Sequence, residues 1–178
     1  MKIRNLILAI LSLSFSISYG QIPDFESNVV VENVFSEQLL KFSKNKDFVI
    51  AFSNPSYWNG YENRYQVLSL TKKKWAIWQY GQQNSISNGT FNLVKKISNK
   101  NALEIIETLD KYDFWNISQD SLKYKTQKPL IADPSTFTFD FITKKRRKQL
   151  QNNSDYKNFS IASSKFMNWW SEMVESKK

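Results

Sequence analysis

Apolar and polar residues alternate along much of the chain with the period of two that is typical of β-strands. The segment 136–143 is the most regular, because phenylalanine occupies every second position and polar residues fill most of the others. The segment 47–53 is apolar at almost every position, which predicts a strand that is covered on both faces. Further strands are predicted over residues 61–70, 74–80, 91–97 and 146–151.

Three other segments repeat their apolar residues with the spacing of an α-helix. Residues 101–112 have a broad apolar stripe and a polar face with Glu104, Glu107 and Asp110, which we expect to be exposed to solvent. Helices are also predicted over residues 33–44 and 160–176. The expected buried side of the last helix consists of Phe166, Trp169, Trp170, Met173 and Val174.

The order of these elements is a helix, about four strands, a helix, two strands and a helix. Short links between strands require antiparallel neighbours, so we predict an α+β fold. Its antiparallel sheet is expected to have about five to six strands, with two to three helices packed mainly on one face. The connection 71–73 lacks the Asn-Gly or Gly that favours a tight hairpin, so the register of that pair is left open.

The first twenty residues have the pattern of a secretory signal peptide. Lys2 and Arg4 precede a short apolar run over 6–17, and small residues before Gln21 predict cleavage there. A membrane-spanning helix needs about 20 apolar residues, so no transmembrane segment is expected after cleavage. The sequence therefore predicts a signal peptide over 1–20 and a single globular domain over 21–178, exported to the periplasm or secreted.

Composition restricts the chemistry that such a domain can carry. The chain contains no cysteine, so we expect neither disulfides nor a lipid-anchored cysteine. It contains no histidine, which excludes Ser-His-Asp and Cys-His catalytic sites and zinc sites built on histidine. Calcium, Walker and dinucleotide-binding loops are absent, so no cofactor and no metal are expected.

Two clusters of basic residues are the strongest charge features of the chain. Its net charge of +9 falls to +7 when the leader is removed, because Lys2 and Arg4 are lost with no acid. The longer cluster is Lys144, Lys145, Arg146, Arg147 and Lys148, and the shorter one is Lys72, Lys73 and Lys74. They could bind an anionic partner, or they could be solvated residues at tight strand connections that keep sheet edges from pairing. Neither cluster is interleaved with aromatic residues, so there is no strong signal for nucleic-acid binding.

Aromatic residues provide the second candidate surface. Tyr57, Trp58 and Tyr61 lie in a predicted loop, where binding residues often concentrate. Trp75 and Trp78 are expected on opposite faces of one strand, and a helix could cover each face or leave one face open to a ligand.

Together these features favour an exported, non-enzymatic binding or interaction protein. Its partner would be an envelope or extracellular component, of anionic or carbohydrate chemistry, bound through the aromatic loop or the basic connection. The alternative is a carboxylate-dependent hydrolase of cell-wall or environmental polysaccharide, which needs two acids about 5–9.5 Å apart. The candidate acids are Glu62, Glu104, Asp133 and Asp140. A third hypothesis is binding of anionic lipid or nucleic acid, which added salt would weaken.

Overall fold

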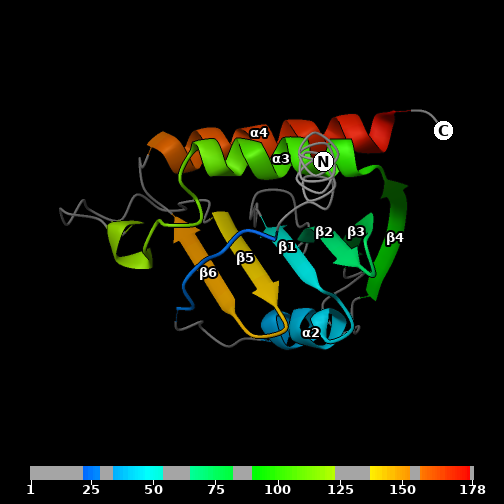
Figure 1. Ribbon diagram of the computed structural model, residues 1–178, viewed down its shortest axis with the longest axis horizontal. Coiled ribbons are helices and arrows are strands. Elements are labelled where there is room, and N and C mark those ends of the chain that lie inside the picture. The colour runs from blue at the N-terminus through cyan, green and yellow to red at the C-terminus, as the bar shows by residue number, and fades with distance from the viewer. Residues whose placement is uncertain are drawn as a thin grey trace, which may run out of the picture.

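The computed structural model describes residues 22–28, 34–53, 65–81, 90–122, 137–152 and 157–176. In these ranges the chain forms three α-helices, one short 3-10 helix and one six-stranded antiparallel sheet (Figure 1). The helices are α2 (Val34–Ser43), α3 (Asn99–Lys111), η2 (Gln119–Leu122) and α4 (Lys157–Glu175). The strands are β1 (Phe48–Ser53), β2 (Tyr65–Thr71), β3 (Lys74–Gly81), β4 (Thr90–Ile97), β5 (Phe137–Thr143) and β6 (Arg147–Asn152). The predicted α+β fold is confirmed.

The sheet lies between two layers of helices, in the strand order β4-β3-β2-β1-β5-β6. Helices α3 and α4 run side by side over one face, and α2 packs on the other (Figure 1). All six residues of β1 are buried, as predicted for a strand that is covered on both faces. None of the helices in the described ranges is long and apolar enough to cross a membrane.

The main core lies between the sheet and the α3–α4 layer, and it is rich in phenylalanine. Phe139 of β5 contacts Phe166 of α4 edge to face, with 5.4 Å between ring centroids. Phe166, Trp169 and Trp170 of α4 are buried, as predicted. Val174 is 47% exposed, so its predicted burial is wrong. The last turn of α4 extends past the centre of the main core. Met173 in that turn is only partly buried against the core.

A second, smaller core lies between the sheet and α2. Leu39 of α2 is fully buried there, beside residues of the central strands. Phe42 stacks on Phe91 of β4 at 4.2 Å and meets Trp78 edge to face at 5.3 Å. Trp75 is 2% exposed in the main core. Helices therefore cover the aromatic rings on both faces of β3.

Helix α3 begins and ends at defined caps. The Ser98 side chain accepts a hydrogen bond from the Asn101 N–H, which is a standard N-cap interaction. At the other end Asp113 adopts a positive φ of 60°. The Phe114 N–H then donates to the Leu109 carbonyl at 3.2 Å, which is the long bond of a Schellman motif. This reversal directs Phe114 into the main core, where it is fully buried.

The two edges of the sheet are protected in different ways. On the β6 edge, the Asn28 side chain bonds both the N–H and the carbonyl of Gln149. The Gln119 side chain does the same for Gln151. These two amides take the place of a neighbouring strand. On the β4 edge, a register shift leaves Val94 as a bulge, and Lys95 and Lys96 follow it. Bulges and lysines are both common features that keep a sheet edge from pairing with another strand.

Candidate functional site

Both basic clusters lie at the same end of the sheet. Phe48, the first residue of β1, pairs with Leu70 near the end of β2 and with Thr143 at the end of β5. The β2–β3 turn and the β5–β6 turn therefore flank the start of β1. We call the exposed cations of these two turns the basic end: Lys72, Lys73, Lys74, Lys144, Lys145 and Arg146.

Asp47, the residue before β1, links the two turns. One oxygen of its carboxylate accepts the backbone N–H of Lys72 at 2.7 Å. The other forms an ion pair of 2.9 Å with Lys144 Nζ. The hydrogen bond from Lys144, together with that from Lys72, holds the pKa of Asp47 below its usual value. Asp47 is thus a fixed negative charge in the middle of a basic surface.

The β2–β3 turn is a two-residue connection in which Lys72 and Lys73 both have positive φ, at 47° and 66°. Tight hairpins commonly use this geometry, and Asn-Gly is the sequence that favours it. Here two lysines adopt it, with the Lys72 N–H fixed by Asp47. This resolves the register left open by the sequence: Thr71 pairs with Lys74.

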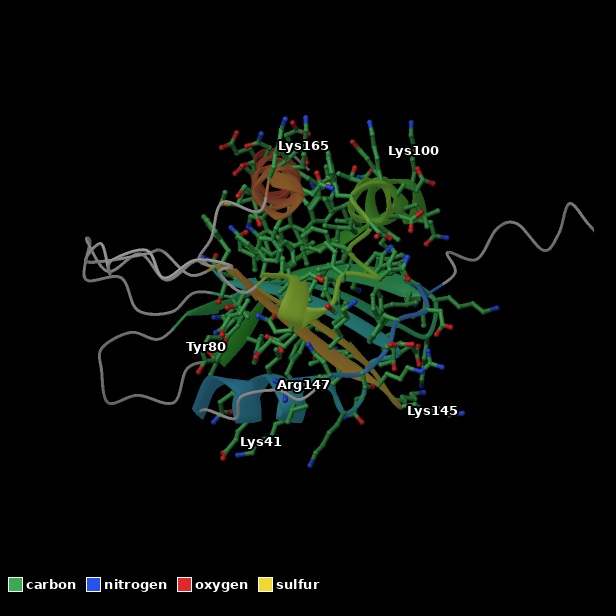
Figure 2. All side chains as sticks on the ribbon, turned by 90° about the vertical axis from the view of Figure 1, so that its left-hand side faces the viewer. Lys41, Tyr80, Lys100, Lys145, Arg147 and Lys165 are labelled. Atoms are coloured by element: carbon green, nitrogen blue, oxygen red, sulfur yellow. The ribbon has the colours of Figure 1, made fainter. Side chains whose placement is uncertain are left out.

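The β5–β6 turn is fixed by the Thr143 hydroxyl. This oxygen accepts the backbone N–H of Arg146 at 2.9 Å and that of Lys145 at 3.3 Å. The side chain of Lys145 is exposed and points away from the sheet (Figure 2). The turn therefore holds its backbone rigidly and presents its cations to solvent.

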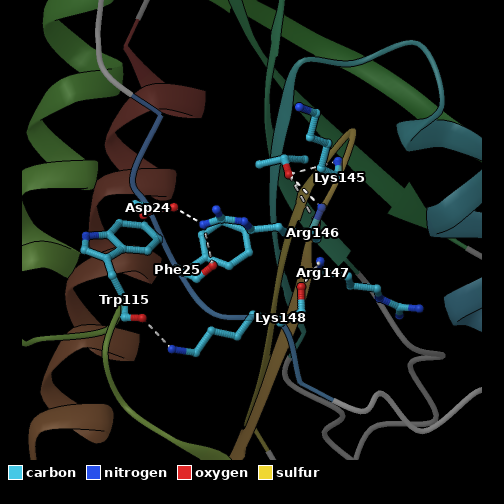
Figure 3. Close-up of polar contacts among 9 residues, drawn as sticks. Asp24, Phe25, Trp115, Lys145, Arg146, Arg147 and Lys148 are labelled. Atoms are coloured by element: carbon cyan, nitrogen blue, oxygen red, sulfur yellow. Dashed lines mark hydrogen bonds and ion pairs between the residues drawn. The ribbon is translucent and has the colours of Figure 1, made fainter.

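Arg146 joins the N-terminal segment to the basic end. Its guanidinium pairs with the Asp24 carboxylate and donates to the Phe25 carbonyl at 3.1 Å (Figure 3). Phe25 is 4% exposed and contacts Phe48 and Phe141 in the main core. Segment 22–28 is thus anchored beside the β5–β6 turn, and half of the Arg146 side chain stays accessible, at 47% exposure.

Arg147 and Lys148 point to opposite faces of β6 and do not belong to the exposed surface (Figure 3). Lys148 is 3% exposed, and its Nζ donates to the carbonyls of Trp115 at 2.6 Å and Phe114 at 3.3 Å. Burial lowers the pKa of its ammonium group. On the other face Arg147 pairs with the buried carboxylate of Asp140 at 3.1 Å. The predicted binding run therefore divides into three surface residues and two residues that hold the fold together.

Lys46 covers the rings on the α2 side. Its Nζ lies 4.6 Å from the centre of the Trp78 ring and 4.9 Å from that of Phe42. Partial burial lowers the pKa of this ammonium group. Trp78 is thus packed between a helix and a cation, which leaves little of its ring for stacking on a ligand.

Several predicted residues lie outside the described residues: Tyr57, Trp58, Tyr61, Glu62 and Asp133. The other two acids considered for a hydrolase lie far apart in the fold. Asp140 is buried on the α2 side of the sheet, and Glu104 is exposed on α3, in the opposite layer. These two carboxylates therefore do not share a site.

A shallow groove between α3 and α4 contains two carboxylates, those of Glu104 and Glu172. Both are exposed to solvent, as the sequence predicted for Glu104. Neither carboxylate is enclosed in a buried pocket of the kind in which a catalytic general acid is usually held. Within the described ranges, no three Asp or Glu side chains come together in a way that could hold a metal ion.

The chain matches no family model, and comparison with curated proteins and with solved structures gives no match.

Proposed function

We propose that this protein is an exported, non-enzymatic binding protein that holds an anionic partner at the basic end. The observation that carries the proposal is the meeting of two sequence-distant basic turns at one end of the sheet, joined through Asp47. Lys144 pairs with Asp47 and Arg146 pairs with Asp24, and both cations remain substantially exposed, at 67% and 47%.

Charge gathered on one surface raises the local concentration of a partner of opposite sign and speeds its association. Each turn is rigid, because its backbone N–H groups are held by Asp47 or Thr143. The cations are therefore carried on a preformed platform, and ordering the backbone adds little to the cost of binding.

The test is retention of the purified protein on a carboxylate-bearing matrix, eluted by a salt gradient. A variant with Lys74, Lys144 and Lys145 each changed to Gln should elute at clearly lower salt than the wild type. The matched control changes Lys111, Lys157 and Lys165 to Gln, which removes the same charge from exposed positions on α3 and α4. Equal elution of the two variants would contradict the proposal, because net charge alone would then explain retention.

Export is tested separately. The protein is expected outside the cytoplasm, and mass spectrometry of the purified protein should show Gln21 as its first residue. The aromatic residues Tyr57, Trp58 and Tyr61 stay a prediction of the sequence. Trp58→Ala in the same retention assay tests whether that loop contributes to binding.

A further inference from the structure

We propose that the basic end binds a linear acidic polysaccharide that crosses both turns, rather than an isolated anion held at one of them. This inference rests on the proposed function and adds to it the class of partner and the way in which it binds.

The centres of the two turns lie well apart along this end of the sheet. In the strand order β4-β3-β2-β1-β5-β6, the centres of the β2–β3 and β5–β6 turns are separated by three strand spacings. Neighbouring strands lie about 4.8 Å apart, so the two turns are about 14 Å apart. Asp47 already occupies the position between the turns where one carboxylate meets both, so a further small anion would contact one turn at a time. A polymer with regularly spaced charges can contact the outer cations of both turns.

The cations of the β5–β6 turn are held in different directions. Lys144 is directed to Asp47, and Arg146 is directed to Asp24 and the Phe25 carbonyl. Lys145 points away from the sheet (Figure 2). The β5–β6 cations therefore diverge and do not enclose one small anion. A surface of this kind gains affinity by making several weak contacts with one long partner.

The surroundings of the basic end favour a polysaccharide over nucleic acid or a membrane. Proteins that bind single-stranded nucleic acid stack bases on exposed aromatic rings, but Trp75 is buried beside this end and Trp78 lies under Lys46. A flat anionic membrane would press against Asp24, Glu26 and Asp47, which lie on or beside the same end. A polymer can pass between these acids and contact the lysines on either side.

The experiment compares galacturonate with long-chain polygalacturonate, which carries one carboxylate on each sugar. Binding is measured by calorimetry at low salt and at equal carboxylate concentration. Bridging of the two turns should make the polymer bind at least about a hundredfold more tightly than the monomer. Affinity for the polymer should also fall linearly in log K against log salt.

Two variants each remove two charges from one turn. Lys72→Asn with Lys73→Gly suits the positive φ angles of the β2–β3 turn, so loss of binding cannot be ascribed to unfolding. Lys144→Gln with Lys145→Gln changes the other turn. If one polymer chain crosses both turns, each variant alone should lose about tenfold or more in affinity for the polymer, because either change ends the bridging. Lys157→Gln with Lys165→Gln on α4 is the control of equal charge.

Asp47→Asn gives a change of opposite sign. The amide keeps an acceptor for the Lys72 N–H, removes the negative charge between the turns and releases Lys144. We expect polymer affinity to rise about fivefold, the size of a single charge interaction at close range in water. If Asp47 had only a structural role, its replacement would weaken binding of the polymer.

The outcomes are distinguishable. If monomer and polymer bind equally per carboxylate, or if one turn variant has no effect, the bridging inference fails and the proposed function stands. If vesicles of phosphatidylglycerol and phosphatidylcholine, or single-stranded oligothymidylate, bind more tightly than polygalacturonate at equal charge, the assignment to polysaccharide fails. If no anion binds the wild-type protein, the proposed function fails as well.

Discussion

Asp140 and Arg147 form an ion pair of 3.1 Å between adjacent strands β5 and β6, on the face that α2 covers. The Asp140 side chain is 1% exposed and that of Arg147 is 15% exposed. Gln149 donates to both carboxylate oxygens, at 3.1 and 3.3 Å. Burial raises the pKa of Asp140, and the Arg147 charge and the Gln149 hydrogen bond act against this rise. The Asp140 carboxylate is thus a buried charge that depends on Arg147 and Gln149 for its stabilisation.

Removing one partner of this pair should be much more harmful than removing both. Asp140→Leu or Arg147→Met leaves an uncompensated charge among buried groups, and each should lower the free energy of unfolding by about 3–5 kcal/mol. The double variant should lose less than either single variant, because apolar residues then fill the space. Urea unfolding of the four proteins gives the coupling energy. Additive losses would show that the two side chains act independently.

The Asp47 carboxylate should stabilise the protein in a defined pH window. Because its folded-state pKa is lowered, its contribution is present above the ordinary pKa of about 3.9 and is lost as pH falls through the folded-state value. Asp140, with a raised pKa, has the opposite sign, since the folded state binds its proton more readily. The difference in unfolding free energy between wild type and Asp47→Asn isolates Asp47. We expect about 0.5–1 kcal/mol at pH 7, because the pair is partly exposed.

Urea titrations between pH 7 and pH 3 measure this difference. It should be constant at neutral pH and shrink towards zero as the Asp47 carboxylate is protonated. A difference that grows in acid would contradict the role given to Asp47.

Lys148 and Lys145 belong to one basic run but should differ in their contribution to stability. Lys148→Met removes the buried donor to the Trp115 and Phe114 carbonyls, which should cost about 1–3 kcal/mol. Lys145→Met changes an exposed residue and should stay within about 0.5 kcal/mol. Chemical denaturation compares the two variants under the same conditions. Equal effects would contradict the assignment of Lys148 to the fold.

Elements with a strong local pattern could be predicted from the sequence. The phenylalanines at 137, 139 and 141 all point to the α3–α4 layer, because period-two alternation directly reflects burial on one face of a strand. The helix predicted over 101–112 is observed over 99–111, because its apolar stripe likewise reflects burial of one face. The position of Lys148 could also have been predicted, since it lies two residues before the buried Leu150 and so on the same face.

The basic end could not be predicted, because it depends on pairing between segments far apart in the chain. Phe48 lies beside Thr143 only because β5 returns to the centre of the sheet and pairs with β1. No local pattern in either strand specifies that neighbour. The ion pair between Asp47 and Lys144 follows from this pairing, as does the joining of the two basic turns.

The β2–β3 turn should be more stable with the residues that its geometry favours. Lys72 and Lys73 have φ angles of 47° and 66°, in a region that costs residues with a side chain about 1–2 kcal/mol each. Asn and Gly tolerate these angles, although Gly also increases the entropy of the unfolded chain. We expect Lys72→Asn with Lys73→Gly to raise the free energy of unfolding by about 1 kcal/mol. The melting temperature should then rise by about 2–4 °C.

Differential scanning calorimetry at neutral pH measures this gain. The control is Lys72→Gln with Lys73→Gln, which removes the same charge from the same positions but keeps residues that do not favour positive φ angles. If relief of like-charge repulsion were the cause, both variants would gain equally. A gain confined to the Asn-Gly variant assigns it to backbone conformation. The same variant should lose affinity for anions, so the two lysines would be residues that lower stability while they serve binding.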